Sequence, residues 1–150
     1  GVGNANNFKY KLNKDFKGSF TKKESGIGKL HYYSPESLGQ DTPHFSIETI
    51  GKETIHTDQR IIDASYNTTM VHTTDLPSPT LSHTFEVPNI VKAQKTQKSM
   101  VGSNLGIYDY RNNSCLTNAA DVLRAGGTDI PASNVQLRKF IKEIFGGGNK

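Results

Sequence analysis

The sequence predicts an α+β domain, because strand-like and helix-like patterns occupy different parts of the chain. Residues 44–62 alternate along a period of two with many β-branched side chains, which is typical of strands. Residues 111–127 and 130–148 repeat apolar side chains at helical spacing and then end in glycines. The chain has 150 residues, enough for one domain with a single modest core. We expect a small antiparallel sheet packed against two helices, one of which carries the cysteine.

The first 30 residues predict a basic and weakly ordered segment that precedes a domain at residues 31–150. They hold seven lysines against two acidic residues, a net charge of +5, whereas residues 31–150 hold eleven basic and twelve acidic side chains. Such a segment can contact nucleic acid or an anionic membrane surface, but a solvated linker is the simpler interpretation. At most a short strand is expected in it, and the folded part should begin near Lys29.

The strands and helices follow from turns and caps. "HFSIETI" and "ETIHTDQRII" on either side of a "GKE" turn predict a hairpin. The stretch at 66–89, interrupted by two prolines, fits one or two strands joined by a loop. Asn89 is a plausible cap for a short helix that buries Ile90, Val91 and the stem of Gln94. "LGIYDYR" predicts a further strand before the two C-terminal helices.

The composition limits the location of the protein. Hydrophobic residues make up 33% of the chain and no run of apolar residues is long enough to cross a bilayer, so no transmembrane segment is expected. The opening residues lack the apolar stretch of a signal peptide. The sequence starts with Gly rather than Met, so we expect it to be part of a larger protein. A single cysteine excludes an internal disulfide.

That cysteine, Cys115, is expected at the first or second position of a helix that Asn112, Asn113 or Ser114 caps. The positive end of a helix dipole favours the reactive thiolate, and the Cys115 N–H can donate to an oxyanion. A lone cysteine is nevertheless more often a buried packing residue. A nucleophilic role requires a base close by.

His44 and His56 are the candidates for that base and for the group that orients it. They flank the predicted "GKE" turn at an even spacing, so an antiparallel hairpin can place them on one face of the sheet. Asp58, two positions beyond His56 on the same face, is the alternative orienting group.

The segment "PHFSIETIGKETIH" resembles the histidine-bearing hairpin of the NlpC/P60 family of papain-like cysteine hydrolases. In that family the cysteine precedes the histidine. Here "YDYRNNSCLTNAADVLRAGG" follows it, an order similar to the circularly permuted branch of lecithin–retinol acyltransferase-like and YiiX-like proteins. The resemblance covers residues 40–145 and implies a permuted papain-like fold. It also implies that Cys115 is the nucleophile, His44 the general base and acid, and His56 the third member, with Asp58 in reserve.

The Asn/Lys/Gly-rich start ahead of a compact C-terminal domain is similar to the toxin domains of bacterial polymorphic toxins of the contact-dependent inhibition or Rhs type. This resemblance implies a secreted or delivered toxin that acts inside a target cell, in the cytoplasm rather than the periplasm. It also implies a cognate immunity protein as partner. The expected reaction is that of a thiol hydrolase or acyltransferase of the peptidase, amidase, deamidase, transglutaminase or lipid-deacylating type, acting on an amide or ester.

Two other functions stay open. A basic ribonuclease toxin would use histidines such as His44, His72 or His83 with lysines, and only then would nucleic acid be a partner. A binding module without catalysis would bury Cys115. No metal is expected, because one Cys and scattered histidines do not supply a tetrahedral ligand set. No cofactor is expected either, because the glycine clusters lack the strand and helix of a phosphate-binding loop.

Overall fold

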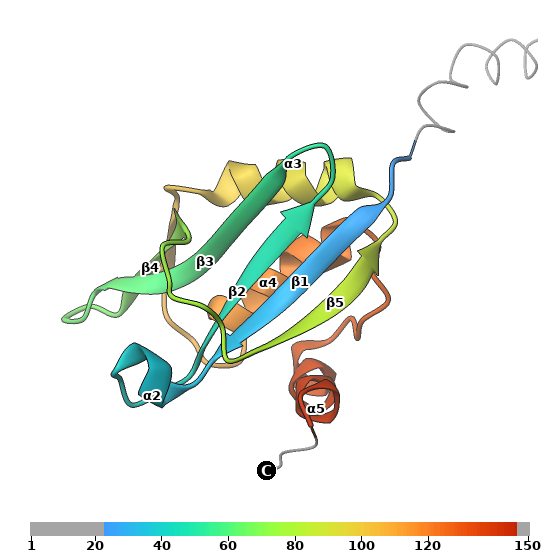
Figure 1. Ribbon diagram of the computed structural model, residues 1–150. Coiled ribbons are helices and arrows are strands. Elements are labelled where there is room, and N and C mark those ends of the chain that lie inside the picture. The colour runs from blue at the N-terminus through green and yellow to red at the C-terminus, as the bar shows by residue number, and fades with distance from the viewer. Residues whose placement is uncertain (1–22, 147–150) are drawn as a thin grey trace, which may run out of the picture.

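The computed structural model describes residues 23–146, which form an antiparallel sheet covered by helices (Figure 1). The strands are β1 (Gly26–Tyr33), β2 (His44–Ile50), β3 (Thr54–Asp63), β4 (Thr68–Thr73), β5 (Leu81–Val87) and β6 (Asn104–Ile107). The helices are α2 (Pro35–Leu38), α3 (Ile90–Met100), α4 (Cys115–Ala125) and α5 (Asn134–Ile144). The predicted α+β class is confirmed. Most of the basic segment expected at residues 1–30 lies outside the described residues, but β1 begins before its boundary.

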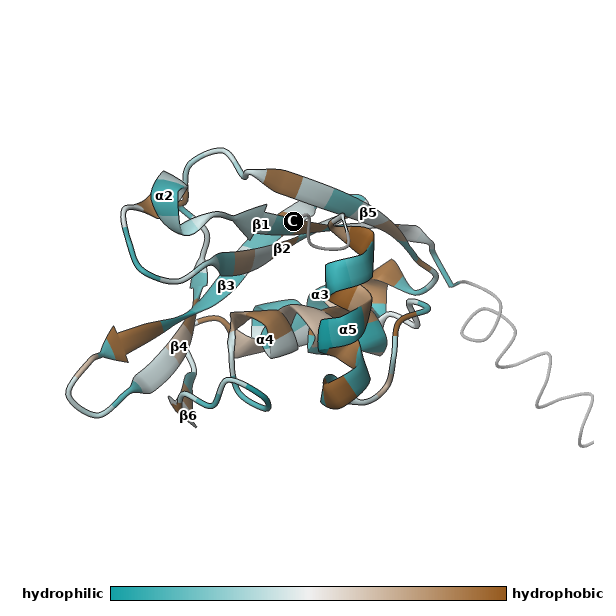
Figure 2. Ribbon diagram, turned by 90° about the horizontal axis from the view of Figure 1, so that it is seen from below, coloured by the Kyte–Doolittle hydropathy of each residue, from teal (hydrophilic) through white to brown (hydrophobic). Residues whose placement is uncertain are grey.

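The sheet has six strands in the order β5-β1-β2-β3-β4-β6. Helices α3, α4 and α5 all lie on one side of it (Figure 2). The connection from β4 to β5 crosses the opposite face, where Thr74 N–H donates to His56 O at 2.8 Å and Thr80 N–H donates to Tyr32 O at 2.8 Å. At the start of this segment, the Thr74 hydroxyl donates to the buried Asp58 carboxylate of β3 at 2.8 Å.

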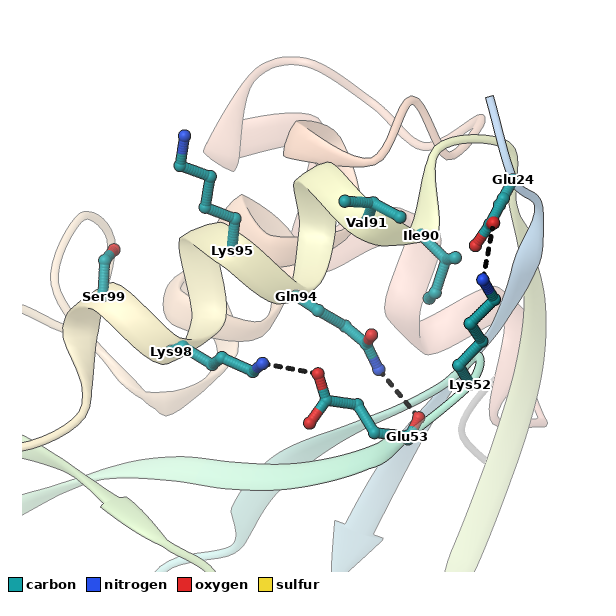
Figure 3. Close-up of a pocket in the computed structure, with 9 residues that line it drawn as sticks. All are labelled: Glu24, Lys52, Glu53, Ile90, Val91, Gln94, Lys95, Lys98 and Ser99. Carbon is teal, nitrogen blue, oxygen red and sulfur yellow. Dashed lines mark hydrogen bonds and ion pairs between the residues drawn. The ribbon is translucent and has the colours of Figure 1, made fainter. Parts of the chain in front are cut away.

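Helix α3 is fastened to the β2–β3 hairpin by glutamine side chains. The fully buried Gln97 amide donates to Ile47 O at 3.1 Å and to Thr57 Oγ1 at 2.9 Å. Gln94 donates to Glu53 O at 3.0 Å, beside an ion pair between Lys98 and Glu53 (Figure 3). These bonds satisfy polar groups that helix packing removes from water.

The inward side of α3 differs from the expectation at one residue. Asn89 caps the helix as predicted, and Ile90 and Gln94 are buried. Val91, however, is 55% exposed, because the buried stripe follows the i, i+3, i+4, i+7 spacing from Ile90. The next residue after Ile90 therefore faces away from the sheet.

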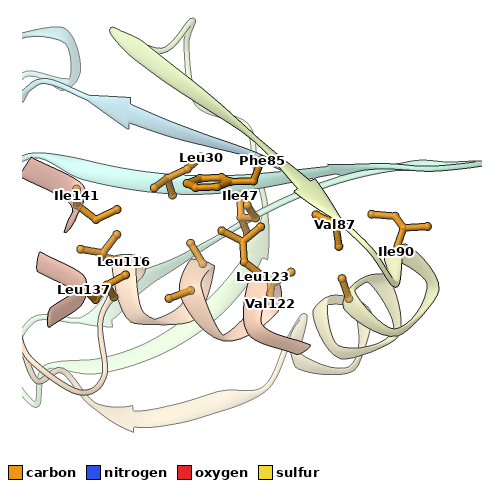
Figure 4. Close-up of a cluster of buried hydrophobic side chains, with 13 residues drawn as sticks. Leu30, Ile47, Phe85, Val87, Ile90, Leu116, Val122, Leu123, Leu137 and Ile141 are labelled. Carbon is orange, nitrogen blue, oxygen red and sulfur yellow. The ribbon is translucent and has the colours of Figure 1, made fainter. Parts of the chain in front are cut away.

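The hydrophobic core lies between the sheet and α4 (Figure 4). The apolar side chains whose helical spacing predicted α4 are all buried: Leu116, Ala119, Ala120 and Leu123. Gly28 of β1 lies under this helix, since a Cβ there would stand 2.6 Å from Leu123 Cδ2. Glycine in β1 thus allows α4 to approach the sheet closely.

The end of the predicted strand at 105–111 is a turn instead. Strand β6 stops at Ile107, and the Asp109 carboxylate accepts from the N–H groups of Arg111 at 2.9 Å and Asn112 at 3.1 Å. An aspartate that binds backbone N–H groups two and three residues ahead favours a turn over a strand. This turn leads directly into α4. Within residues 23–146 no helix is both long and apolar enough to span a membrane.

Candidate active site

Cys115 is the first residue of α4, and Ser114 is the cap among the three candidates. The Ser114 hydroxyl accepts from Thr117 N at 3.3 Å, and Thr117 Oγ1 accepts from Ser114 N at 2.8 Å, which forms a capping box. An amide at the first helical position has no acceptor within the helix. The Cys115 N–H is therefore available to a ligand, and the thiol is half-buried rather than sealed in the core.

The residue two positions before Cys115 fixes the loop that carries it. Asn113 Nδ2 donates to Leu105 O at 2.8 Å and to Ile107 O at 2.9 Å, along the outer edge of β6. Its Oδ1 accepts from the buried Gln59 Nε2 of β3 at 2.8 Å. Both sides of the Asn113 amide thus tie the start of α4 to the sheet.

His44, the first residue of β2, interacts with both Cys115 and Asp58. Its Nε2 donates to Asp58 Oδ2 at 2.8 Å, which leaves Nδ1 as the ring nitrogen for Cys115. Burial alone would lower the pKa of His44, but its hydrogen bonds with Asp58 and Cys115 outweigh burial and raise the pKa to about 9. The imidazolium form is therefore favoured at neutral pH, next to the thiol.

Asp58 is held as a carboxylate although its side chain is fully buried. Burial would raise its pKa, but hydrogen bonds from His44 and Arg60 lower the pKa to about 2. Arg60 donates through Nη2 at 2.7 Å and Nε at 3.0 Å, and Thr74 Oγ1 adds a bond of 2.8 Å. The carboxylate is thus a fixed negative charge behind the His44 ring.

His56 does not occupy the position beside His44 that was expected for it. The β2–β3 register pairs His56 with Glu48, four residues along β2 from His44, a separation of about 13 Å at the rise of a strand. The expectation was wrong because β3 continues to Asp63, so His56 lies near its beginning rather than its end. His56 Nε2 is instead hydrogen-bonded with Ser46 Oγ at 2.6 Å.

A cavity of about 600 Å³ opens in front of Cys115 and His44. Polar and apolar side chains share its wall: Gln59, Arg60, Ile61, Thr69 and Tyr108. Burial raises the pKa of the Tyr108 phenol, and the neighbouring Cys115 adds to the shift, so this hydroxyl is a neutral hydrogen-bond donor beside the thiol. The cavity can therefore admit a polar substrate to the sulfur.

Sequence analysis did not single out Arg60, Thr74, Gln59 or Tyr108. Arg60 could have been predicted as a partner of Asp58, because the two residues are two positions apart on one strand and so share a face. Thr74 and Tyr108 reach the site from loops whose path no local pattern specifies.

The remaining histidines do not join His44 in one cluster. His72 is the cross-strand partner of Asp58, and its Nδ1 is hydrogen-bonded to Met70 O of its own strand at 3.3 Å. His83, on β5, faces the helix side of the sheet, with its ring 4.7 Å from that of Phe85. In the described part of the chain, no group of three or more His, Cys, Asp or Glu side chains is arranged to hold a metal ion.

A second cavity, also of about 600 Å³, lies far from this chemistry, between α3 and the β2–β3 turn (Figure 3). Ion pairs of Glu24 with Lys52 and of Glu53 with Lys98 line it. Among its lining residues there is no histidine or cysteine. It shares no residue with the Cys115 cavity, which is the better candidate for catalysis.

Comparison of the chain with models of protein families, with curated proteins and with solved structures gives no significant match. The functional interpretation therefore depends on the arrangement of Cys115, His44 and Asp58. A thiol at a helix start, an imidazole that contacts it and a buried carboxylate behind the imidazole together have the geometry that thiol–imidazole catalysis requires.

Proposed function

We propose that the protein is a thiol-dependent hydrolase or acyltransferase. Cys115 is the nucleophile, His44 the general base and acid, and Asp58 the residue that orients His44. The observation that carries the proposal is that His44 lines the same cavity as Cys115 and has its Nε2 held by the buried Asp58 carboxylate at 2.8 Å. Asp58 takes the third role here in place of His56, because His56 lies about four strand positions from His44.

The reaction begins when the Cys115 thiolate attacks the carbonyl carbon of an amide or ester. A C–S bond forms, and the carbonyl electron pair moves to oxygen, where the Cys115 N–H donates to the oxyanion. The oxyanion then collapses, and the imidazolium of His44 protonates the leaving amine or alcohol as its bond to carbon breaks. In the second half, His44 takes a proton from water or another acceptor, which attacks the thioester and releases Cys115.

The biological role belongs to the same proposal. Within the α+β class we assign the chain a permuted papain-like fold, because its histidine hairpin precedes its cysteine helix in the sequence. By its resemblance to polymorphic toxins we infer that the domain is delivered from a producing bacterium and acts in the cytoplasm of a target cell. An immunity protein that covers the Cys115 cavity would then protect the producer.

The test is induced expression of the domain in a bacterium, with Cys115→Ala as the matched inactive variant. We expect growth arrest with the wild type and normal growth with Cys115→Ala at equal protein level. Mass spectrometry of cellular proteins then identifies the reaction, because deamidation, cross-linking and proteolysis give different mass changes. If Cys115→Ala arrests growth as strongly as the wild type, the thiol mechanism is wrong, and RNA cleavage becomes the next activity to measure.

A further inference from the structure

A groove of about 470 Å³ adjoins the polar cavity, with which it shares Pro43. We call it the α5 groove and define it by six of its lining residues: Tyr32, Phe45, Leu116, Ile141, Lys142 and Phe145. Leu116 is the neighbour of Cys115 in the chain. Pro43, the neighbour of His44, lines both this groove and the polar cavity. A substrate that reacts at the thiol in the polar cavity can therefore extend past Pro43 into this groove.

The wall of the α5 groove is aromatic. The ring centroids of Tyr32 and Phe45 are 5.5 Å apart, and the Phe145 ring lies 6.0 Å from the first and 6.1 Å from the second. All three rings are only half-buried. Rings that are packed together but left partly open to solvent favour an apolar group that completes their burial.

The groove is shallow, because the core closes behind it. Leu116 and Ile141 form both the floor of the groove and one wall of a core void of only about 10 Å³. Figure 4 shows these two side chains pointing into the packed cluster between α4, α5 and the sheet. A long acyl chain cannot continue into the core at this point. The groove in front of this packed layer has room for a bulky apolar side chain.

The open side of the groove is positively charged. Arg138 stacks on Tyr110 with its guanidinium carbon 3.5 Å from the ring centre, and the exposed Lys142 follows one helical turn later. Within residues 23–146 no carboxylate forms an ion pair with either cation. Cations without a carboxylate partner beside an apolar groove favour a ligand that carries an anion next to its apolar group.

We propose that the α5 groove binds a peptide segment of the substrate with a bulky apolar side chain next to the scissile bond and a carboxylate just beyond it. This proposal rests on the proposed function, since it takes Cys115 as the reacting group. It narrows the substrate class from any amide or ester to acidic peptides with an aromatic or large aliphatic residue at the cleavage site.

The experiment uses the single cysteine as its reporter. Rates of Cys115 alkylation are measured with N-ethylmaleimide, N-phenylmaleimide and N-(4-carboxyphenyl)maleimide, with glutathione as the reference thiol. We expect the ratio of the phenyl rate to the ethyl rate to be about tenfold higher for Cys115 than for glutathione. The ratio of the carboxyphenyl rate to the ethyl rate should exceed that of glutathione by a still larger factor.

Variants assign those preferences to the groove. Phe145→Ala should reduce the phenyl preference to that of glutathione, whereas Val135→Ser, an exposed apolar position of the same helix outside the groove, should retain it. Lys142→Glu should remove the preference for the carboxylate, and Lys139→Glu should not. Circular dichroism checks folding. If Phe145→Ala is unfolded, Leu81→Asp, at a 46% exposed groove position, replaces it and should disfavour the carboxyphenyl reagent.

Two failures are distinguishable. If Cys115 reacts faster than glutathione with every reagent but shows no extra phenyl or carboxylate preference, the groove proposal is overturned and the thiol mechanism stands. If Cys115 reacts no faster than glutathione with any reagent, the proposed function fails and the groove proposal fails with it.

Discussion

Asp58 is the residue on which the position of His44 depends. Its buried carboxylate accepts hydrogen bonds from His44, Arg60 and Thr74. The bonds from Arg60 and Thr74 orient the carboxylate toward His44. A carboxylate fixed in this way selects the tautomer and the angle of the imidazole.

We predict that Asp58→Asn lowers the free energy of unfolding by about 3 kcal/mol, because it leaves Arg60 without its buried anionic partner. Asp75→Asn is the matched control, since Asp75 is bonded to the same Arg60 but has a side chain that is 79% exposed. Its loss should cost less than about 0.5 kcal/mol. Denaturant unfolding measures both. Equal losses for the two variants would contradict the structural role given to Asp58.

At the level of single residues, the structure brings Asp58, rather than the expected His56, to the ring of His44. The even spacing of their positions correctly placed His44, His56 and Asp58 on one face of the sheet. The choice between His56 and Asp58 depends on how far each lies along β3, which is set by the register and not by parity. Arg60 on the same strand was the one local indication that Asp58 is a fixed carboxylate.

The start of α4 is the element that presents the Cys115 thiol. Its capping box holds the first turn, so the direction of the Cys115 N–H depends on the hydroxyl of Ser114 and on Thr117. Helix α5 begins at a cap of the same kind, with the Ser133 hydroxyl accepting from Gln136 N at 3.2 Å. The two serines therefore form a natural pair for comparison.

We predict that Ser114→Ala and Ser133→Ala each reduce the free energy of unfolding by about 1 kcal/mol, as loss of a cap does. Only Ser114→Ala should also slow the reaction of Cys115 with iodoacetamide, because only that cap orders the turn around the thiol. Thermal unfolding and alkylation rates measure the two effects. A similar slowing in both variants would show that general stability, and not the α4 cap, governs the reactivity of Cys115.

The helices and strands that were predicted most clearly are those whose ends are marked by capping residues, glycines or turns. Helices α3, α4 and α5, together with the β2–β3 hairpin, were predicted from the Asn89 cap, the polar residues before Cys115, the glycines that end both C-terminal helix patterns and the "GKE" turn. Most of β1 was missed, because Gly26 and Gly28 weaken its strand pattern and Lys29 continues the run of lysines before it. Its place between β2 and β5 comes from long-range pairing that no local pattern contains.

At the scale of the whole molecule, the fold joins its parts across long sequence separations. Strand β1 pairs with both β2 and β5, and α4 packs beneath β2 and β3. The order of the six strands could not be predicted from the sequence, since every hairpin pattern fits several orders. It is this order that brings Cys115, late in the chain, to His44.

The stability of the molecule should depend on pH through His44. Its pKa is raised in the folded state from 6.5 to about 9, so its contribution is complete below pH 6.5 and is lost as the pH rises through 9. We predict that the free energy of unfolding falls on the order of 3 kcal/mol across this range, and that His44→Gln flattens the change. Urea titrations between pH 6 and 10 measure it. A decline of the same size in His44→Gln would show that another group is responsible.

In the proposed mechanism the Cys115 thiol and the His44 imidazole form one reacting pair, and the rate of Cys115 alkylation by iodoacetamide at pH 6 measures how strongly His44 activates the thiol. At this pH an ordinary thiol is almost entirely protonated and reacts slowly, whereas a thiolate paired with an imidazolium reacts fast. We predict a fast reaction in the wild type and a rate at least about tenfold lower in His44→Ala. A wild-type rate equal to that of His44→Ala would contradict the account.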